Sequence, residues 1–507
     1  MLTRPSSRDA IVLAALACSL LFVFIDQARD HGLQKGHRGW CSANILGIVE
    51  HATPRNGFVG HTLQYANEHS NKQFVYFDRY PVFFAVALHG VLNTVELSRG
   101  EQIQVARQAM NVLYALSLIM AIAFLLELGV SPALAVGAAT LAASGKMMVT
   151  YRDMIHCDHA ALVGFMTLLW AIARWYRTRN DRLIYFVTAF AVLMGRGYAS
   201  FAVLAVWWTV EAVLAVRTSK QAFKSFVLGT ATRACVLAIA LGATCLAYNI
   251  SVEAGRNQVS WTKVGIVDSA TRRILDTEER ASKEHKKELR WSKFGKVQTE
   301  RFVANAQPFF GPGFLPRSTW AKVALLLLCF GGVGAFIATR KLELRPPMIV
   351  AALSGVVWIV AMRGLTAFHD FTIMFMLSCM VLLMLALIHW MPERLALIPA
   401  LLGCAVLVLS TADRNAQLEN ERALGELYTD DFARIEQQLK PGEAFEIEPT
   451  ILKKIVPGVP YALGWFLPNN YIADRSSTWI LSTKAKRKGA KNVTPKNRKL
   501  FLYRKQG

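Results

Sequence analysis

Eleven hydrophobic runs alternate with short polar linkers along most of this chain, and this alternation leaves few folds open to it. The runs approach the roughly 20 apolar residues that an α-helix needs to cross a bilayer. Hydrophobic residues make up 53% of the 507 residues and the mean hydropathy is +0.31, whereas a soluble chain of this length usually divides into several domains of lower hydropathy. The sequence therefore predicts an all-α polytopic membrane protein with a small additional soluble domain.

Basic residues between the runs give the expected orientation. The predicted spans are residues 10–27, 105–127, 131–150, 159–175, 182–198, 200–216, 227–249, 319–338, 347–363, 371–389 and 394–411. Lys and Arg cluster before the first span, after the fourth, sixth and eighth, and before the eleventh. With a cytosolic N-terminus all five clusters lie in the cytosol, as the positive-inside rule requires. The short apolar stretch Pro81–Val95 is expected to be an interfacial or re-entrant helix, because counting it as a span would put several clusters outside.

Two long polar segments interrupt the predicted transmembrane domain, which covers residues 1–411. The first outer loop is expected at residues 28–104, and a large outer loop at residues 250–318. Within the large loop, the mixed charge of Thr271–Trp291 predicts an exposed helix.

The last residues, 412–507, are expected to form a small soluble α/β domain. A helical pattern near 415–439 precedes two short candidate strands at Thr478–Ser482 and Leu500–Tyr503. Ten Lys and Arg and no acidic residue occur from Lys484 to Lys505, which favours the cytosol, whereas the odd number of spans puts the domain outside. Long domains translocate largely regardless of charge, so the expected location is extracytoplasmic.

The net charge of +22 has an ordinary explanation in a membrane protein. Cytosolic loops rich in Lys and Arg produce such an excess, and they attract anionic lipid head groups. A phosphorylated lipid substrate is the functional alternative. Nucleic acid is not expected as a partner, because the sequence contains no recognised binding module.

Four clusters of ionisable residues occur at span ends that this topology puts outside. Ionisable groups at membrane depth are costly, so such clusters need a reason. The first cluster contains Asp30, His37, Arg38 and Trp40. Asp30 and His37 are candidate general bases, and Arg38 and Trp40 are candidate substrate contacts. Ordinary interface anchoring by Arg, Tyr and Trp is the competing interpretation of any single residue.

The second cluster, Asp78 and Arg79, comes just before the proline that opens the interfacial helix. Asp78 is a candidate catalytic carboxylate, and the Arg79 guanidinium suits a phosphate leaving group. A helix start with proline in its first turn explains the same residues without any chemistry.

The third cluster lies between the third and fourth spans. It contains Arg152, His156 and Asp158. Asp158 is a candidate catalytic residue, and Arg152 and His156 are candidate substrate contacts. Histidine beside carboxylates binds a divalent metal or forms an acid–base pair, so a metal is possible without being required.

The fourth cluster flanks a short outer loop before the tenth span and contains Arg363, His369 and Asp370. Arg363 is a candidate phosphate ligand, and His369 and Asp370 are candidates for orienting a sugar or phosphate oxygen. Arg196, at another outer turn, is a candidate for the same site.

The motifs in these clusters resemble those of the GT-C superfamily of membrane glycosyltransferases, over roughly residues 10–411. A bacterial subgroup carries His-His-Gly-Trp-Asn-Ser-Ala in its first outer loop, which compares with His37–Ala43. Its Tyr-Thr-His-His-Pro-Pro-Leu compares with Tyr76–Val82, and its Gly-Arg-Met-Val-Asn-His-Glu compares with Arg152–Asp158. Its late His-Asp-Tyr/Phe matches His369–Phe371.

The resemblance implies that the transmembrane domain is catalytic. It implies transfer of a sugar, with inversion, from a polyprenyl-phosphate-linked donor to a lipid, glycan or protein acceptor on the outer face of the membrane. Arg79, Arg363 and Arg196 would then stabilise the polyprenyl phosphate that leaves. No nucleotide or other cofactor is required by such a reaction. The default location is a bacterial inner membrane.

Departures from the family pattern leave the identity of the base open. The subgroup's His-His pair before proline is Arg79–Tyr80 here, and the familiar Asp-Glu of the first loop is absent. Asp26, Asp30 and Asp78 therefore compete with His37 for that role.

Two other classes of membrane protein remain as alternatives. A secondary transporter is expected to show inverted repeats and polar groups at mid-membrane, whereas the polar groups here lie at span ends. A flippase would tolerate neutralisation of the clustered carboxylates, and a transferase would not.

Overall fold

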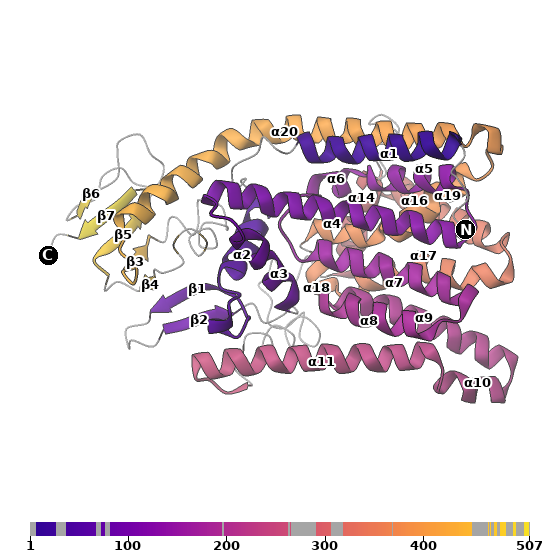
Figure 1. Ribbon diagram of the computed structural model, residues 1–507, viewed down its shortest axis with the longest axis horizontal. Coiled ribbons are helices and arrows are strands. Elements are labelled where there is room, and N and C mark those ends of the chain that lie inside the picture. Colours follow the sequence, from indigo (N-terminus) through magenta and orange to yellow (C-terminus); the bar gives the residue numbers. More distant parts are fainter. Residues whose placement is uncertain are drawn as a thin grey trace.

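The described part of the chain forms a bundle of long helices with a β-sheet beyond one end (Figure 1). The computed structural model describes residues 7–26, 37–66, 72–76, 82–194, 197–261, 264, 290–305, 318–367, 369–448, 465, 467, 471–473, 477–482, 490–492 and 501–505. The expected exposed helix Thr271–Trp291 lies outside these residues, apart from Arg290 and Trp291.

Each of the eleven predicted spans contains a helix of the bundle. These helices are α1 (Ser7–Asp26), α4 (Arg99–Glu127), α5 (Pro132–Ala143), α7 (Asp158–Thr178), α8 (Asp181–Met194), α9 (Gly197–Thr218), α11 (Thr230–Asn257), α16 (Thr319–Ala338), α17 (Arg345–Ala361), α19 (Leu377–Ile388) and α20 (Leu397–Gln438). Eight of the described helical segments are long and apolar enough to cross a membrane, which confirms a polytopic helical membrane protein. The helices α5, α7 and α8 are not among the eight, so their crossing remains a prediction.

The helix α7 lies at the centre of the bundle, packed against α4, α8, α9 and α17. Its neighbour α8 approaches closely at Gly164, where a Cβ atom would lie only 2.9 Å from the Ala191 Cα. The absence of a side chain at Gly164 therefore permits this contact. Small residues permit such close helix contacts in lipid. At the periphery, by contrast, only 11% of the most apolar window of Gln221–Asn257 is buried, against 83% for Asp370–Ile388. Most of the α11 surface is therefore exposed, whereas α19 forms part of the core.

Two predicted spans become irregular at the end of the bundle that faces the sheet, here called the sheet-side end (Figure 1). One run is divided at Ser144 and Gly145 into α5 and the short helix α6 (Lys146–Tyr151). Another begins as the 3₁₀ helix η6 (Asp370–Met376) before it continues as α19. Irregular backbone within a membrane-spanning run is tolerated only where protein surrounds it or where it lines a water-filled cavity. These two breaks therefore indicate an enclosed region inside the bundle.

The predicted outer segments that the structure describes lie at the sheet-side end (Figure 1). They include α2 (His37–Glu50) and α3 (Val82–Asn93), which pack on each other. The helix α3 corresponds to the expected interfacial helix. The start of α1 and the short helix α10 (Lys220–Val227) lie at the opposite end. Which end faces the cytosol remains a prediction.

A seven-stranded sheet combines strands from two distant parts of the chain. In sheet order the strands are β2 (Lys72–Tyr76), β1 (His61–Ala66), β4 (Tyr471–Ala473), β3 (Ala444–Ile447), β5 (Trp479–Ser482), β7 (Phe501–Lys505) and β6 (Ala490–Asn492). The β1–β2 hairpin belongs to the first outer loop and joins β4 in parallel, with Tyr65 opposite Ile472. The sequence predicted β5 and β7 but not this hairpin. The C-terminal strands thus share one sheet with the first loop, and α20 runs without a break across the expected domain boundary at residue 411.

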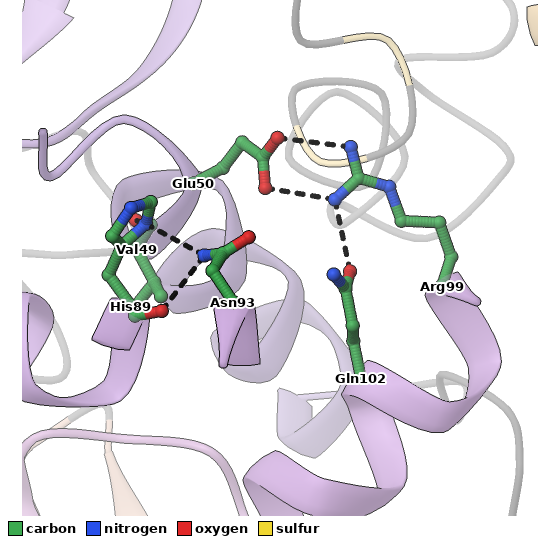
Figure 2. Close-up of polar contacts among 6 residues, drawn as sticks. All are labelled: Val49, Glu50, His89, Asn93, Arg99 and Gln102. Atoms are coloured by element: carbon green, nitrogen blue, oxygen red, sulfur yellow. Dashed lines mark hydrogen bonds and ion pairs between the residues drawn. The ribbon is translucent and has the colours of Figure 1, made fainter. Parts of the chain in front are cut away.

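An ion pair, here called the joint, connects α2 to the start of α4 (Figure 2). Arg99 Nη1 donates to Glu50 Oε2 at 2.9 Å, and Arg99 Nη2 donates to Glu50 Oε1 at 3.2 Å. The Arg99 guanidinium also lies 4.3 Å from the centre of the Trp465 ring. Beside it, His89 Nδ1 of α3 lies 2.8 Å from the Val49 carbonyl oxygen (Figure 2). These contacts attach the first loop and the C-terminal segment to the bundle.

Candidate active site

The segment of residues 151–158, here called the site loop, connects α6 to α7 at the sheet-side end. Tyr151 Oη donates to Asp370 Oδ2 at 2.5 Å, which joins the loop to the start of η6. Burial and the neighbouring carboxylate raise the pKa of the Tyr151 phenol, so the phenol stays protonated as the donor. Arg152 Nη2 donates to Asn415 Oδ1 of α20 at 2.8 Å. The loop is therefore fixed to two helices that are distant in sequence.

Further contacts hold the middle of the site loop. The Ile155 backbone N–H donates to Ser42 Oγ of α2 at 3.1 Å. The Phe371 ring lies between two histidines, 5.0 Å from the His156 ring and 5.2 Å from the His369 ring, measured between ring centres. The structure thus brings the third and fourth predicted clusters together, and α2 of the first loop contacts the same place.

The charged side chains of the site loop are almost completely buried. The exposed fraction is 0% for Arg152 and Asp158, 1% for Asp153 and 5% for His156. Removing charges from water costs several kcal/mol per ion, of order 20 kcal/mol in the idealised limit. A site that concentrates such groups is a candidate for catalysis or binding.

His156 and Asp158 form an acid–base pair in the site loop. His156 Nδ1 lies 3.4 Å from Asp158 Oδ2, and the Asp158 backbone N–H donates to His156 Nδ1 at 3.3 Å. Asp158 is also the first residue of α7, where the helix dipole favours a negative charge. The local sequence therefore places a buried carboxyl group at the N-terminus of a helix.

The same segment offers ligands for a metal ion. One ligand atom each of His156, Cys157 and Asp158 lies within 4.8 Å of the others, and all three residues are buried. A nitrogen, a sulfur and a carboxylate oxygen suit Zn²⁺, whereas Mg²⁺ prefers oxygen ligands alone. These residues therefore fit zinc better than magnesium.

Arg363, a predicted phosphate ligand, lies at the start of α18 (Arg363–Thr366). Its guanidinium is 4.3 Å from the centre of the Trp291 ring. A guanidinium stacked on an aromatic ring keeps its hydrogen-bond donors at its edge, where a phosphate oxygen can accept from them. Its role remains a prediction.

Several predicted site residues are beyond comparison with the structure. Asp30, Asp78, Arg79 and Arg196 lie outside the described residues. The first turn of α2 contains three more whose side chains are not described, namely His37, Arg38 and Trp40. The roles predicted for these seven residues remain predictions.

Sequence reasoning missed three residues that hold the site loop: Tyr151, Asn415 and Ser42. Tyr151 directly precedes the predicted cluster, so its position alone was a signal. Asn415 comes four residues after the last predicted span, and only the continuation of α20 brings it to Arg152. Ser42 lies in a compared motif, but nothing in its type indicated a backbone contact with Ile155.

The overall arrangement is similar to that of solved membrane transferases. ArnT from Cupriavidus metallidurans, in the apo state, superposes with a TM-score of 0.57 over 98% of this chain and 98% of that chain, at 10% sequence identity. The Archaeoglobus fulgidus oligosaccharyltransferase in complex with Zn and sulfate gives a TM-score of 0.52 over 92% of this chain and 62% of that chain, at 12% identity.

A second structure of the archaeal protein, AglB in complex with an inhibitory peptide and a dolichol-phosphate, gives a TM-score of 0.50 at 12% identity and covers 92% of this chain and 65% of that chain. No protein-family model and no curated protein matches the sequence. The likeness therefore rests on three-dimensional structure, and it extends over nearly the whole chain. This chain has the fold of the GT-C membrane glycosyltransferases.

Proposed function

We propose that this protein is a membrane glycosyltransferase that moves a sugar from a polyprenyl-phosphate-linked donor to a lipid, glycan or protein acceptor. The observation that carries the proposal is the proximity of buried Asp158 and His156 to the partly buried Tyr151–Asp370 hydrogen bond, at the sheet-side end of a GT-C bundle. The archaeal structure with dolichol-phosphate supports a lipid-linked donor. We place the site on the outer face of a bacterial inner membrane.

In the proposed reaction the acceptor hydroxyl oxygen forms a bond to the anomeric carbon as the bond from that carbon to the phosphate oxygen breaks. The electron pair of the broken bond leaves with polyprenyl phosphate. The hydroxyl proton passes to a carboxylate or imidazole base, and attack from the opposite face inverts the anomeric centre. Among the predicted catalytic residues, Asp158 is the one whose side chain the structure describes, so it is the first to test as the base.

The charge that develops on the leaving phosphate requires cationic donors nearby. Arg363 is the described candidate, and Arg79 and Arg196 are the others that the sequence supplies. Removal of one well-placed donor in other enzymes costs about 10²–10³ in rate. A cofactor is not part of this mechanism as proposed. If a divalent metal is bound, His156, Cys157 and Asp158 would hold it, and it would add positive charge beside the phosphate.

The test uses the full chain in proteoliposomes with radiolabelled polyprenyl-phosphate-linked hexoses and pentoses and with lipid, glycan and peptide acceptors, and it measures release of polyprenyl phosphate together with transfer of the label to an acceptor. The wild-type protein is expected to release it from one of these donors. Asp158→Asn is expected to slow the release at least about 100-fold, since general base catalysis contributes roughly 10²–10⁴. Asp413→Asn is the matched control, because Asp413 is an exposed carboxylate on α20.

One result would remove the proposal, and another would remove only the role of Asp158. Transbilayer movement of the intact donor without release of polyprenyl phosphate would make the protein a flippase or transporter. Equal release rates for Asp158→Asn and Asp413→Asn would take Asp158 out of the chemistry.

A further inference from the structure

The helix α14 (Trp291–Asn305) contacts both halves of the candidate site without belonging to either. One half is α6, which ends at Tyr151, and the other is the turn from α18 to η6, which contains Asp370. The hydrogen bond from Tyr151 to Asp370 connects these two halves directly. Whatever fixes their separation therefore also fixes the geometry of the site loop.

At its C-terminal end, α14 caps α6. Asn305 Oδ1 accepts hydrogen bonds from the Met147 and Met148 backbone N–H groups, at 3.0 and 3.4 Å. The first N–H groups of a helix have no partner within the helix, so an oxygen supplied from elsewhere stabilises that end. Asn305 is 1% exposed, which leaves little water to replace it.

The local sequence of α6 makes room for this cap. A Cβ atom on Gly145 would lie 2.3 Å from Asn305 Oδ1 and 2.6 Å from Asn305 Cγ. Only glycine therefore allows Asn305 to reach the helix end. The break between α5 and α6 is thus matched to a side chain about 160 residues further along the chain.

Two turns earlier, the same face of α14 holds the other half of the site. Gln298 Nε2 donates to the Thr366 carbonyl oxygen at 2.8 Å. Arg301 donates to Thr366 O through Nη1 and to Ala367 O through Nη2, the latter at 3.3 Å. These carbonyls lie at the C-terminal end of α18, where carbonyls lack helical partners and a cation is favoured.

One helix, α14, provides all of these contacts from a single face. Residues 298, 301 and 305 fall on one face of a helix. The helix is itself fixed to the bundle, because Phe294, Phe302 and Val303 are buried and the Phe302 ring stacks on Phe330 of α16. A fixed helix that holds two segments from one face sets the distance between them.

We infer that α14 is a positioning clamp, in which Asn305 and Arg301 hold α6 and the α18–η6 turn at the separation that the Tyr151–Asp370 bond and the site loop need. This inference rests on the proposed function for its kinetic consequence alone. Neither residue touches the reacting atoms in this scheme, so each is a positioning residue. Loss of the clamp is expected to misplace catalytic groups without removing them.

The experiment compares Asn305→Ala with Asn305→Asp in the full chain. Alanine removes the acceptor, whereas aspartate keeps a carboxylate oxygen for the same N–H groups and suits a helix N-terminus. Hydrogen exchange is measured at the backbone amides of Met147 and Met148, together with kcat and KM for the lipid-linked donor. We expect Asn305→Ala to exchange at least about 10-fold faster at these amides and Asn305→Asp to behave like the wild type.

The kinetic expectation separates positioning from binding. A small displacement of catalytic groups lowers kcat by about 10- to 100-fold, while KM changes by less than about 3-fold. Rescue of both amide exchange and kcat by Asn305→Asp supports the clamp. If Asn305→Ala exchanges faster at these amides but the wild-type protein shows no transferase activity, the clamp is supported and the proposed function is removed. Wild-type amide exchange in Asn305→Ala overturns the clamp, whatever the activity.

Gly145 provides a second, independent variant. Gly145→Ala is expected to displace Asn305 and to reproduce the faster exchange of Asn305→Ala, because the added Cβ occupies the place of Oδ1. In the double variant Gly145→Ala, Asn305→Ala the added Cβ meets no Asn305 side chain. The increase in amide exchange is therefore expected to be far smaller than the product of the increases in the two single variants. Multiplicative effects would show that Gly145 acts without Asn305 and would overturn the cap.

Discussion

The joint and the site loop both hold opposite charges within the sheet-side end, yet they differ in exposure and in geometry. In the joint, Arg99 and Glu50 make two parallel hydrogen bonds, and each side chain keeps 24% of its surface exposed. In the site loop, Asp158 is fully buried and its described neighbour His156 lies 3.4 Å away. The joint is explained by charge pairing alone. The site loop differs because its ionisable groups are almost completely buried, and their removal from water opposes folding.

This difference teaches which charges serve structure and which serve chemistry. A pair that stabilises a contact satisfies both partners and tolerates water. A group kept for reaction is buried at a cost that a neutral replacement would avoid. Substitutions in the two regions should therefore have opposite effects on activity and stability.

The largest effect is expected for Asp158→Asn, measured as transfer rate and melting temperature on the same sample. The rate should fall at least about 100-fold. The melting temperature should change by less than about 5 °C, because an amide of the same shape loses the pairing of the carboxylate together with the cost of burying its charge. A melting temperature lower by more than about 5 °C would assign Asp158 a structural role and erase the contrast with the joint.

An intermediate effect is expected from pH at two histidines beside the joint. The His51 and His61 rings stack with their centres 3.9 Å apart. Burial lowers the pKa of His51 to about 4, with Arg99 and His89 lowering it further and Glu50 opposing. Burial, His51 and Arg256 lower the pKa of His61 to about 2.

Both folded pKa values lie below the ordinary value of about 6.5, so the unfolded chain takes up protons first as the pH falls. Their contribution to stability is complete above pH 6.5 and is lost as the pH falls toward 4, by at most about 1.4 kcal/mol per pH unit for each group. Melting temperature between pH 7 and pH 4.5 checks this. The double variant His51→Gln, His61→Gln should flatten the dependence, and an unchanged slope would contradict the assignment.

The smallest effect is expected in the joint itself. Glu50→Ala and Arg99→Ala should each lower the free energy of unfolding by about 1–2 kcal/mol, and a double-mutant cycle should give a coupling of about 1 kcal/mol, since the pair is partly exposed. The transfer rate should change less than about 3-fold. A loss of activity as large as that of Asp158→Asn would show that the joint takes part in the chemistry.

Much of the bundle follows from the sequence, because lipid leaves a long apolar run few choices other than a helix. All eleven runs contain helices, and the ends of Thr319–Ala338 were predicted correctly. The division at Gly145 was not predicted, since it depends on Asn305 of a distant helix. The β1–β2 hairpin was missed for a related reason: its outer partner, β4, lies at the other end of the chain.

For the candidate site, the structure brings two predicted clusters together, and their function stays a prediction. The third and fourth clusters were recognised because ionisable residues at span ends are costly, and the structure places Tyr151 against Asp370 between them. The residues that hold the clusters were not recognised, because Asn415, Arg301 and Asn305 act through contacts between elements far apart in sequence. The type of a residue indicates which chemistry it can perform. Which residues hold it in place depends on contacts that only the folded chain provides.

The pairing of Tyr65 with Ile472 has a consequence for biosynthesis. The β1–β2 hairpin is synthesised before α3 and the helices that follow it, but its partner strand β4 appears only after α20. Until then the hairpin carries an unpaired edge, which is a hazard for association with other chains. Closure of the sheet therefore waits for a contact of very high sequence separation, and a chain truncated before β4 would expose that edge to the quality-control proteases of its compartment.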